Sequence, residues 1–419
     1  LENVILGSEG GALITQSLEK ARIELTRLAK EYGLEVELDI AVEDLSVGMQ
    51  QRVEILKGLY KGAKVLILDE PTGVLTPQES DELFRIFDAL KKQGVTIILI
   101  THKLREIMNI TDHVSVMRAG KMVAHRETSK TNPEELAELM IGRKVLLNIK
   151  KSKAKSGKAL LVANNLEIHN EQGLKRVTNV SFEARSGEIL GIAGVTGNGQ
   201  GSLLKALAGI LPLSQGSIEI MGETISPKHP LNPKQLRELG VAHVPEDRQK
   251  MGMIADFSAS ETALLGYHND KEINQGVWLK SYSVKANCES LMEAFDVRPS
   301  NPNLMSSNFS GGNQQKLILA REFERNPEVL IIGQPTRGVD IGAIEFIRKR
   351  IIAMRDAGKA IILISVELEE IMSLSDRIIV MCDGEITGMV DTKDANEATL
   401  GMMMANAFQP QNELKRAEL

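Results

Sequence analysis

The stretch Val65-Leu66-Ile67-Leu68-Asp69-Glu70-Pro71-Thr72 places four apolar residues directly before two adjacent carboxylates and a proline. A continuous apolar run predicts a strand buried on both faces, as in a parallel α/β sheet. Because an isolated buried carboxylate is costly, we expect Asp69 and Glu70 to meet a cation or to take part in chemistry. The carboxyl edge of such a sheet is where α/β proteins bind ligands. There, one acid can hold a magnesium ion while the other orients a water molecule against a phosphate.

Two neighbouring segments bear on the alternative, a strand that merely ends in a polar turn. Leu45-Ser46-Val47-Gly48-Met49-Gln50-Gln51-Arg52 lies upstream and opens a helical pattern, and Ile97-Ile98-Leu99-Ile100-Thr101-His102 is a second apolar strand that ends in a histidine. In order and spacing, the three segments resemble the signature, Walker B and switch-histidine motifs of an ABC-type ATPase. The resemblance implies an α/β nucleotide-binding fold of the P-loop NTPase class.

Length and composition exclude several other classes of protein. The chain has 419 residues, which predicts two or three domains, and its 42% hydrophobic and 25% charged residues are typical of a globular protein. A net charge of −6 gives no broad nucleic-acid-binding face. Only Cys288 and Cys382 occur, which excludes a disulfide framework and fits a reducing cytosol. The apolar runs are far shorter than the roughly 20 residues of a membrane helix.

An internal repeat sets the architecture. Ser46-Val47-Gly48-Met49-Gln50 recurs as Ser310-Gly311-Gly312-Asn313-Gln314, and the same spacing along the chain carries Asp69-Glu70-Pro71-Thr72 onto Gly333-Gln334-Pro335-Thr336. It also carries Thr101-His102 onto Ser365-Val366 without a gap. We therefore predict two copies of one α/β domain: residues 1–143 and 159–408, joined by a lysine-rich linker at 144–158 that we interpret as a solvated tether, with a polar tail at 409–419.

Only the second copy carries a glycine-rich loop. The apolar run 187–194 leads into Val195-Thr196-Gly197-Asn198-Gly199-Gln200-Gly201-Ser202, and apolar helical spacing follows. Strand, glycine-rich loop and helix form a phosphate cradle in P-loop proteins, so the nucleotide-binding candidates are Gly194, Gly197, Asn198, Gly199, Gln200 and Ser202. A dinucleotide-binding loop is disfavoured because the glycine spacing is wrong for it.

The first copy has no such loop, so we expect it to be incomplete. By analogy with the length of one module, an N-terminal stretch of roughly 100 residues would be missing. A natural half-domain is the alternative, and it would leave the core exposed.

The second copy has lost the reactive groups of a P-loop ATPase. Gln200 stands at the lysine position, Gly201 at the hydroxyl position, Gly333 at the magnesium acid and Gln334 at the water-orienting acid, and Val366 replaces the histidine. Losing one charge-assisted contact to phosphate costs about 1.5–3 kcal/mol. We predict that this site does not hydrolyse ATP, although its glycines can still hold nucleotide.

The resemblance assigns roles to the motif residues. In a tandem ABC protein the modules pair head to tail, so that Asp69 would bind Mg²⁺, Glu70 would act as the base and His102 would contact the γ-phosphate of one ATP. The same nucleotide would meet a second group of residues, namely Ser310, Gly311, Gly312, Gln314 and Asp340. The second site, which we expect to be degenerate, would combine the glycine-rich loop of the second copy with Ser46, Gly48 and Gln50. This chain alone is expected to be inactive.

Within the family, the chain is similar to the tandem ATPase subunits of bacterial importers for simple sugars and nucleosides. Two segments are typical of the second module in these subunits: Pro245-Glu246-Asp247-Arg248 and Gln334-Pro335-Thr336-Arg337-Gly338. The segments 42–52 and 74–79 favour the nucleoside branch. The resemblance implies transmembrane permease subunits, an indirect extracytoplasmic binding lipoprotein, no nucleic acid, and a peripheral location at the cytoplasmic face of the membrane. The coupling surface would lie near residues 245–248 and 256–293. Alternatives are a translation- or DNA-associated ABC ATPase, or a non-catalytic scaffold.

Overall fold

The structure, a computed structural model, describes residues 1–6, 14–45, 47–72, 77–118, 120–144, 151–170, 172–195, 197–271, 273–276 and 278–404. It divides into two compact units, Leu1–Val145 and Leu146–Leu419, and the division falls inside the predicted linker. The predicted tail and Ser46 lie outside the described residues.

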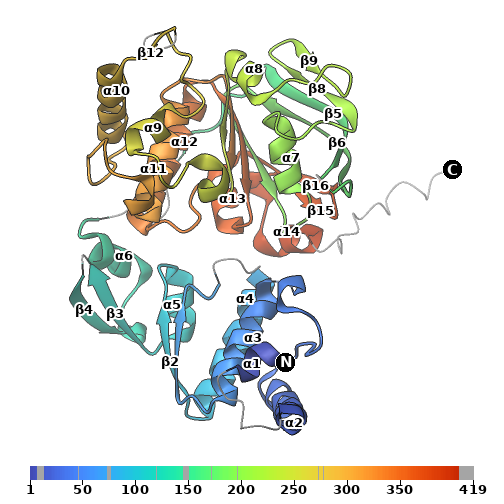
Figure 1. Cartoon of the computed structure of the whole chain (residues 1–419), viewed down its shortest axis with the longest axis vertical. Coiled ribbons are helices and arrows are strands. Elements are labelled where there is room, and N and C mark those ends of the chain that lie inside the picture. Colours follow the sequence, from blue (N-terminus) through green and yellow to red (C-terminus); the bar gives the residue numbers. More distant parts are fainter. Residues whose placement is uncertain are drawn as a thin grey trace, which may run out of the picture. The chain divides into compact units, whose positions relative to one another are not determined.

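The second unit is built on a six-stranded sheet (Figure 1). Its order is β10-β13-β14-β7-β15-β16, and the first five strands are parallel while β16 runs antiparallel to β15. Leu330 and Ile332 of β13 pack on one face, and Val329 and Ile331 pack on the other. The apolar run of β13 is therefore buried on both sides, as is typical of a strand in a parallel α/β sheet. The strands are β7 (Glu188–Ala193), β10 (Val241–Val244), β13 (Val329–Gly333), β14 (Ala360–Ser365), β15 (Arg377–Cys382) and β16 (Glu385–Asp391).

Different layers cover the two faces of this sheet. Six helices form the core on one face: α9 (Ala259–Leu264), α10 (Ser281–Ala294), α11 (Gly311–Phe323), α12 (Ile341–Asp356), α13 (Leu368–Leu374) and α14 (Glu397–Met404). The other face packs against α7 (Gln200–Leu207), α8 (Pro233–Glu238) and an antiparallel sheet of β6 (Lys175–Arg185), β5 (Ala159–His169), β8 (Gln215–Ile220) and β9 (Glu223–Ile225). A short hairpin joins β11 (Asn274–Gln275) and β12 (Trp278–Leu279) near α10 (Figure 1).

The described residues of the first unit contain one parallel pair, β1 (Val65–Asp69) and β2 (Thr96–Ile100). The helices that pack on one face of it are α1 (Glu2–Ile5), α2 (Ile14–Tyr32), α3 (Val47–Tyr60) and α4 (Pro77–Lys92). Then follow α5 (Leu104–Ile110), the antiparallel pair β3 (His113–Arg118) and β4 (Lys121–Glu127), and α6 (Pro133–Ile141). The side chain of Asn132 caps α6, and Pro133 opens it as predicted.

The predicted repeat is present element by element. With the spacing that relates the sequence motifs, β1 matches β13, β2 matches β14, and β3 and β4 match β15 and β16. The prediction that the strand at residues 65–69 is buried on both faces was wrong: Ile67 of β1 is 66% exposed, whereas its counterpart Ile331 is fully buried. Among the described residues, the first unit has no counterpart of β7, α7 or the antiparallel sheet β6-β5-β8-β9. The described residues therefore form two tandem copies of an α/β domain, and those of the first copy lack these elements.

The described part of the linker, residues 151–158, is attached to the second unit. Lys151 Nζ donates to the carbonyl oxygen of Leu374 at 3.0 Å, and Arg355 Nη2 donates to that of Ser152 at 3.1 Å. The Gly157 amide donates to Ser186 O at 2.8 Å. Most residues of this stretch are exposed, so its interpretation as a solvated tether stays a prediction, while these hydrogen bonds attach parts of it to the second unit.

Candidate nucleotide sites

Glu70 and His102 meet at the carboxyl ends of β1 and β2. The Glu70 amide donates to Ile100 O at 2.8 Å, which continues the strand pairing and holds Glu70 at a φ of 46°. The Glu70 Oε1 atom lies 2.7 Å from His102 Nδ1 and accepts from the His102 amide at 3.2 Å. The side chains are 39% and 22% exposed, so both remain accessible. The two predicted catalytic residues thus form one hydrogen-bonded pair.

The second unit repeats this geometry without the reactive groups. The Gln334 amide donates to Ile364 O at 2.8 Å, and Gln334 has a φ of 49°. Its Oε1 atom accepts from the Val366 amide at 3.4 Å, in the place where Glu70 accepts from His102. An amide oxygen keeps the shape of the site but cannot take a proton at neutral pH. The end of β13 therefore has the same backbone geometry as the end of β1, but no side chain there can act as a base.

A buried hydrogen bond between a threonine and a glutamate lies behind each strand end, and it was not predicted from the sequence. Thr72 Oγ1 donates to Glu106 Oε1, and at the matching positions of the repeat Thr336 Oγ1 donates to Glu370 Oε1 at 2.7 Å. Burial raises the pKa of Glu370 to about 7. The same spacing along the chain relates Thr72 to Thr336 and Glu106 to Glu370, so the repeat carried the signal, but the sequence does not show that each threonine binds its glutamate.

Asp69 is exposed at the end of β1. Among the described residues, no group of three or more histidine, cysteine, aspartate or glutamate side chains could hold a metal ion. Magnesium binding by Asp69 stays a prediction.

The glycine-rich loop of the second unit runs from β7 into α7. Gly197 and Gly199 both have a φ of 98°, a conformation that favours glycine. Asn198 O accepts from the Gly384 amide, and Ser202 lies half-buried in the first turn of α7. The Gln200 side chain is 4% exposed, and its Nε2 atom has no hydrogen-bond partner within the described ranges. A Cβ atom on Gly194 would overlap with that nitrogen. The Gln200 amide therefore packs against Gly194, at a position where a side chain larger than that of glycine would not fit.

Glu246 lies beside Gly201 and Gly333, two positions at which the second unit lacks the reactive side chains of a P-loop ATPase. A Cβ atom on Gly201 would lie 2.8 Å from Glu246 Oε2, and one on Gly333 would lie 2.6 Å from Glu246 Cγ. Burial raises the pKa of Glu246, while nearby Arg337 and Lys205 oppose that shift. From the sequence, Glu246 was expected only in the coupling surface near residues 245–248, because nothing local in the sequence places residue 246 beside 201 and 333.

The two glycines that open α11 make room for contacts within the second unit. A Cβ atom on Gly311 would lie 2.5 Å from Arg248 Nη2, and one on Gly312 would lie 3.2 Å from Asp340 Oδ2. Asp340 caps α12 by accepting from the Ala343 amide at 2.8 Å. Ser310 precedes α11 and accepts from Asn313 Nδ2 at 2.9 Å. The glycines therefore have a packing role, and their contact with nucleotide stays a prediction.

Gln50 and Gln314 act in the same way in their own units. Gln50 Nε2 donates to the carbonyl oxygens of Val42 and Leu45 at 3.0 and 3.1 Å. Gln314 Nε2 donates to Ser306 O at 3.0 Å, and its Oε1 atom accepts from Arg248 Nε at 3.3 Å. Each amide ties its helix to the preceding turn, and nucleotide binding by either residue also stays a prediction. Gly48 lies in the first turn of α3.

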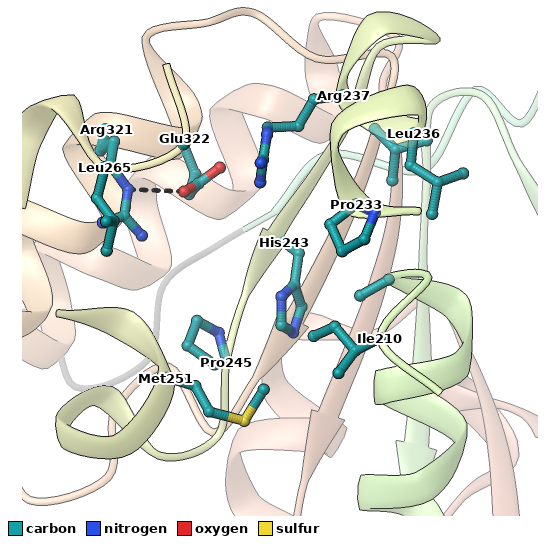
Figure 2. A pocket seen from close by; sticks show the side chains of 13 residues that line it. Ile210, Pro233, Leu236, Arg237, His243, Pro245, Met251, Leu265, Arg321 and Glu322 are labelled. Carbon is teal, nitrogen blue, oxygen red and sulfur yellow. Dashed lines mark hydrogen bonds and ion pairs between the residues drawn. The ribbon is translucent and has the colours of Figure 1, made fainter. Parts of the chain in front are cut away.

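A cavity of about 280 Å³ lies in the second unit beside His243 of β10 (Figure 2). His243 Nε2 is buried without a hydrogen-bond partner in the described chain. Burial, and next Arg321 and Arg237, lower the pKa of His243 to about 4. Arg321 Nε donates to Glu322 Oε1 at 2.8 Å. The lining residues are Ala208, Ile210, Pro233, Leu236, Arg237, Val241, His243, Pro245, Met251, Leu265, Gly266, Arg321 and Glu322.

A family model described as "ABC transporter" matches residues 3–73 and 177–337. These segments include the Glu70 strand end, the glycine-rich loop and the Gln334 strand end. The chain belongs to the ABC transporter family. As an ABC ATPase it is an enzyme that binds ATP and couples hydrolysis to transport, and the two matched segments agree with two tandem domains.

Proteins similar to this ABC ATPase include importer subunits. It is 44% identical to the nucleoside import ATP-binding protein NupA of Lactococcus lactis subsp. cremoris, over 96% of this chain and 79% of NupA. It is also 44% identical to the guanosine import ATP-binding protein NupO of Bacillus subtilis, over 97% of this chain and 79% of NupO. The glucose import ATP-binding protein TsgD13 of Haloferax volcanii is 41% identical over 91% of this chain and 69% of that protein.

A solved structure shows the same fold. The ATP-binding cassette MJ1267 of an ABC transporter is 18% identical, covers 61% of this ABC ATPase and 100% of its own chain, and has a TM-score of 0.50. Across the described ranges, no helix combines the length and apolar composition needed to cross a bilayer.

Proposed function

We propose that this ABC ATPase powers import of a nucleoside through a separate membrane permease. The relatives named for nucleoside and guanosine import are 44% identical to it, whereas those named for glucose and ribose import are 41% and 37% identical. Import of a simple sugar is the second candidate.

The observation that carries the catalytic part of this proposal is the Glu70–His102 pair. Glu70 is held at a strand end by a ring nitrogen and a backbone amide, beside the exposed Asp69. Glu70 orients and deprotonates the attacking water, and His102 contacts the γ-phosphate. Asp69 binds Mg²⁺, which neutralises phosphate charge when it is present. Preorganised groups of this kind stabilise charge that develops at the phosphate.

The second unit binds nucleotide without hydrolysing it. Gln334 has the geometry of Glu70 but no carboxylate, and Val366 replaces His102. The amino end of the 13-residue helix α11 favours an anion. A role in phosphate binding is therefore kept for Ser310, Gly311, Gly312 and Asp340. The outcome is one hydrolytic site and one degenerate site.

The permease binds at the cavity beside His243. Pro245 and Leu265 line that cavity and belong to the two segments predicted to form the coupling surface. Apolar side chains with a few buried polar groups suit a short helix of a partner protein. An extracytoplasmic lipoprotein delivers the substrate to the permease and acts on this subunit only indirectly. This ABC ATPase then lies peripherally at the cytoplasmic face of the membrane and binds no nucleic acid.

The test uses the intact transport complex with Glu70→Gln, which removes the base and keeps the shape. We expect ATP turnover to fall about 10²- to 10⁴-fold, the usual contribution of a general base, while ATP affinity in equilibrium dialysis is unchanged. Glu127→Gln, at an exposed glutamate of β4, is the matched control and should retain full turnover.

Uptake measurements decide the substrate. Cells that carry the complex should accumulate labelled guanosine but neither ribose nor glucose, and Glu70→Gln should abolish that uptake. Full turnover in Glu70→Gln would remove Glu70 from the role of base. Uptake of sugar alone would replace the nucleoside proposal by the second candidate.

A further inference from the structure

Three large side chains are exposed within five consecutive positions, where β12 leads into α10 (Figure 1). Trp278 is 79% exposed, Leu279 is 48% exposed and Tyr282 is 87% exposed. Trp278 is also the one tryptophan in a chain that is 3% aromatic. An isolated apolar side chain at a surface needs no explanation, but three such side chains in one short segment indicate a contact surface.

The segment 278–285, which contains these side chains, is basic although the chain is acidic. It carries Lys280 and Lys285 and no aspartate or glutamate, whereas the whole chain has a net charge of −6. Lys285 is exposed, and Lys280 is half-buried. The first acid beyond the segment is Glu289, one turn further along α10. The segment therefore combines apolar area with a charge that complements an anionic partner.

A small buried cluster holds the segment from behind. The Lys280 amide donates to Ile273 O at 2.9 Å, and β12 pairs antiparallel with β11. The side chains buried in the cluster are Leu264, Ile273 and Val284. Because these contacts already fix the backbone, the segment loses little further conformational freedom when a partner binds.

The segment adjoins the surface at which the permease is proposed to bind. Leu264 at the end of α9 is buried beneath the segment, and the next residue, Leu265, lines the cavity beside His243. The end of α9 therefore supports both surfaces. A permease held at the cavity brings the segment towards the bilayer that the permease spans.

We propose that Trp278, Leu279 and Tyr282 enter the headgroup region of an anionic membrane, while Lys280 and Lys285 lie at its phosphates. Tryptophan and tyrosine favour this region because it offers both an apolar and a polar environment to one ring. Lysines gain from the negative potential of the lipid surface, and their apolar stems can lie along it. This inference rests on the proposed peripheral location at the membrane, and it adds the lipid contact that orients the subunit there.

The contact orients the subunit and does not anchor it. A single myristoyl chain binds a membrane with an association constant of roughly 10⁴ M⁻¹, and side chains that reach only the headgroup region gain less than an acyl chain does. The permease therefore supplies most of the affinity, and the segment adds a second contact that fixes the orientation.

The first experiment uses the fluorescence of Trp278, which reports on this segment alone because the chain has no other tryptophan. The whole chain is titrated at low salt with concentrated vesicles, made either of phosphatidylcholine and phosphatidylglycerol in equal parts or of phosphatidylcholine alone. The mixed vesicles should shift the emission to shorter wavelengths, and lipids brominated in the acyl chain should quench it. Raising the salt concentration should reverse both effects, because the lysines act through a screened potential.

Variants separate the charge from the aromatic ring. Lys280→Gln together with Lys285→Gln should weaken binding to the mixed vesicles about 25-fold, since one lysine near an anionic surface contributes about fivefold. Tyr282→Ser should weaken it severalfold and leaves the tryptophan in place as the probe. Lys153→Gln together with Lys155→Gln makes the same charge change at exposed linker residues and should leave binding unchanged. Unchanged melting temperatures establish that the variants are folded.

The second experiment distinguishes lipid from protein. In the intact transport complex, Trp278→p-benzoylphenylalanine carries a photoreactive ring at the same position. Illumination should yield adducts with phospholipid, which mass spectrometry of the peptide identifies. Adducts with the permease alone would overturn the proposal and assign the segment to a protein contact.

Failure of this proposal can be told apart from failure of the proposed function, because the vesicles contain no permease. If Trp278 emission does not respond to the mixed vesicles, the lipid contact is wrong, whatever the uptake measurements give. If it responds equally to both kinds of vesicle, an anionic membrane is not what the segment recognises, and the proposal is wrong. If the vesicles produce the full response while the transport complex takes up neither nucleoside nor sugar, the import proposal is wrong and the lipid contact stands.

Discussion

Replacing Arg355 by methionine should destabilise the second unit strongly, because this arginine is the fully buried partner of Asp376. Its side chain is 1% exposed, and Nη1 donates to Asp376 Oδ1 at 2.9 Å. Asp376 Oδ2 accepts from the Ile189 amide at 3.0 Å, at the start of the strand that leads into the glycine-rich loop. The pair therefore joins the end of α12, the start of β15 and the start of β7.

The expected magnitude follows from what remains after the change. Removing one partner of a buried ion pair costs about 3–5 kcal/mol. Asp376 keeps the Ile189 amide and lies 3.3 Å from Lys151 Nζ, so the cost should fall at the lower end, about 3 kcal/mol. Methionine fills most of the space of the arginine stem, which limits any cavity cost. At about 2–4 °C per kcal/mol for a large domain, the melting temperature should fall by about 6–12 °C.

Scanning calorimetry of the whole chain measures this change. Arg298→Met is the matched control, because Arg298 pairs with Asp296 at the surface with both side chains more than half exposed, and it should cost under about 1 kcal/mol. Asp376→Asn and the double variant complete a cycle in which the double variant should be less destabilised than the sum of the two single ones. Hydrogen exchange of the β7 peptide should accelerate in Arg355→Met. A cost equal to that of Arg298→Met would refute the reasoning.

Two further predictions concern groups that the structure buries. Burial lowers the pKa of His243 to about 4, so the folded protein resists protonation that the unfolded chain accepts near pH 6.5; this contribution of about 3 kcal/mol is complete above pH 6.5 and is lost as pH falls to 4. Chemical denaturation at several pH values should therefore give a flatter stability curve for His243→Gln over that interval, and an unchanged slope would contradict the assignment. Gly194→Ala should destabilise by about 1–3 kcal/mol, because its Cβ atom would collide with the Gln200 amide and lie 2.7 Å from Met381 O. Gly157→Ala, which meets its neighbours only at 3.4 Å or more, should be tolerated in the same thermal-melting assay, and equal melting temperatures for the two variants would count against the collision.

The sequence predicted the elements whose information is local. The apolar runs before Asp69 and after Gly187 are strands, the glycine-rich loop enters a helix, and Pro133 opens α6. The internal repeat also revealed which reactive groups the second unit lacks, because Glu70 and Gln334 could be compared without any structure. Hydrophobic periodicity, the glycines and prolines that end or begin elements, and sequence repeats are all properties of short segments. They can therefore be recognised without knowing the tertiary structure.

The partners of these residues became visible only in three dimensions. The sequence named Gln50 and Gln314 as nucleotide ligands, and the structure uses both amides to tie a helix to its preceding turn. The sequence also did not show that Lys151, in the predicted linker, binds carbonyl oxygens of the second unit. Each of these contacts depends on the position of a backbone atom in another element, which composition does not encode.

By itself, the sequence determined that the chain is a tandem α/β ABC ATPase with one set of reactive strand-end residues and one eroded set, because those facts depend on residue types at fixed spacing. Only the tertiary structure decided that Glu246 lies in the space left by Gly201 and Gly333, and that Arg355 is buried against Asp376. The physical reason is that a vacant volume and a buried charge pair are each made by segments distant in the chain. Their positions are fixed by packing of the whole domain and not by any one segment.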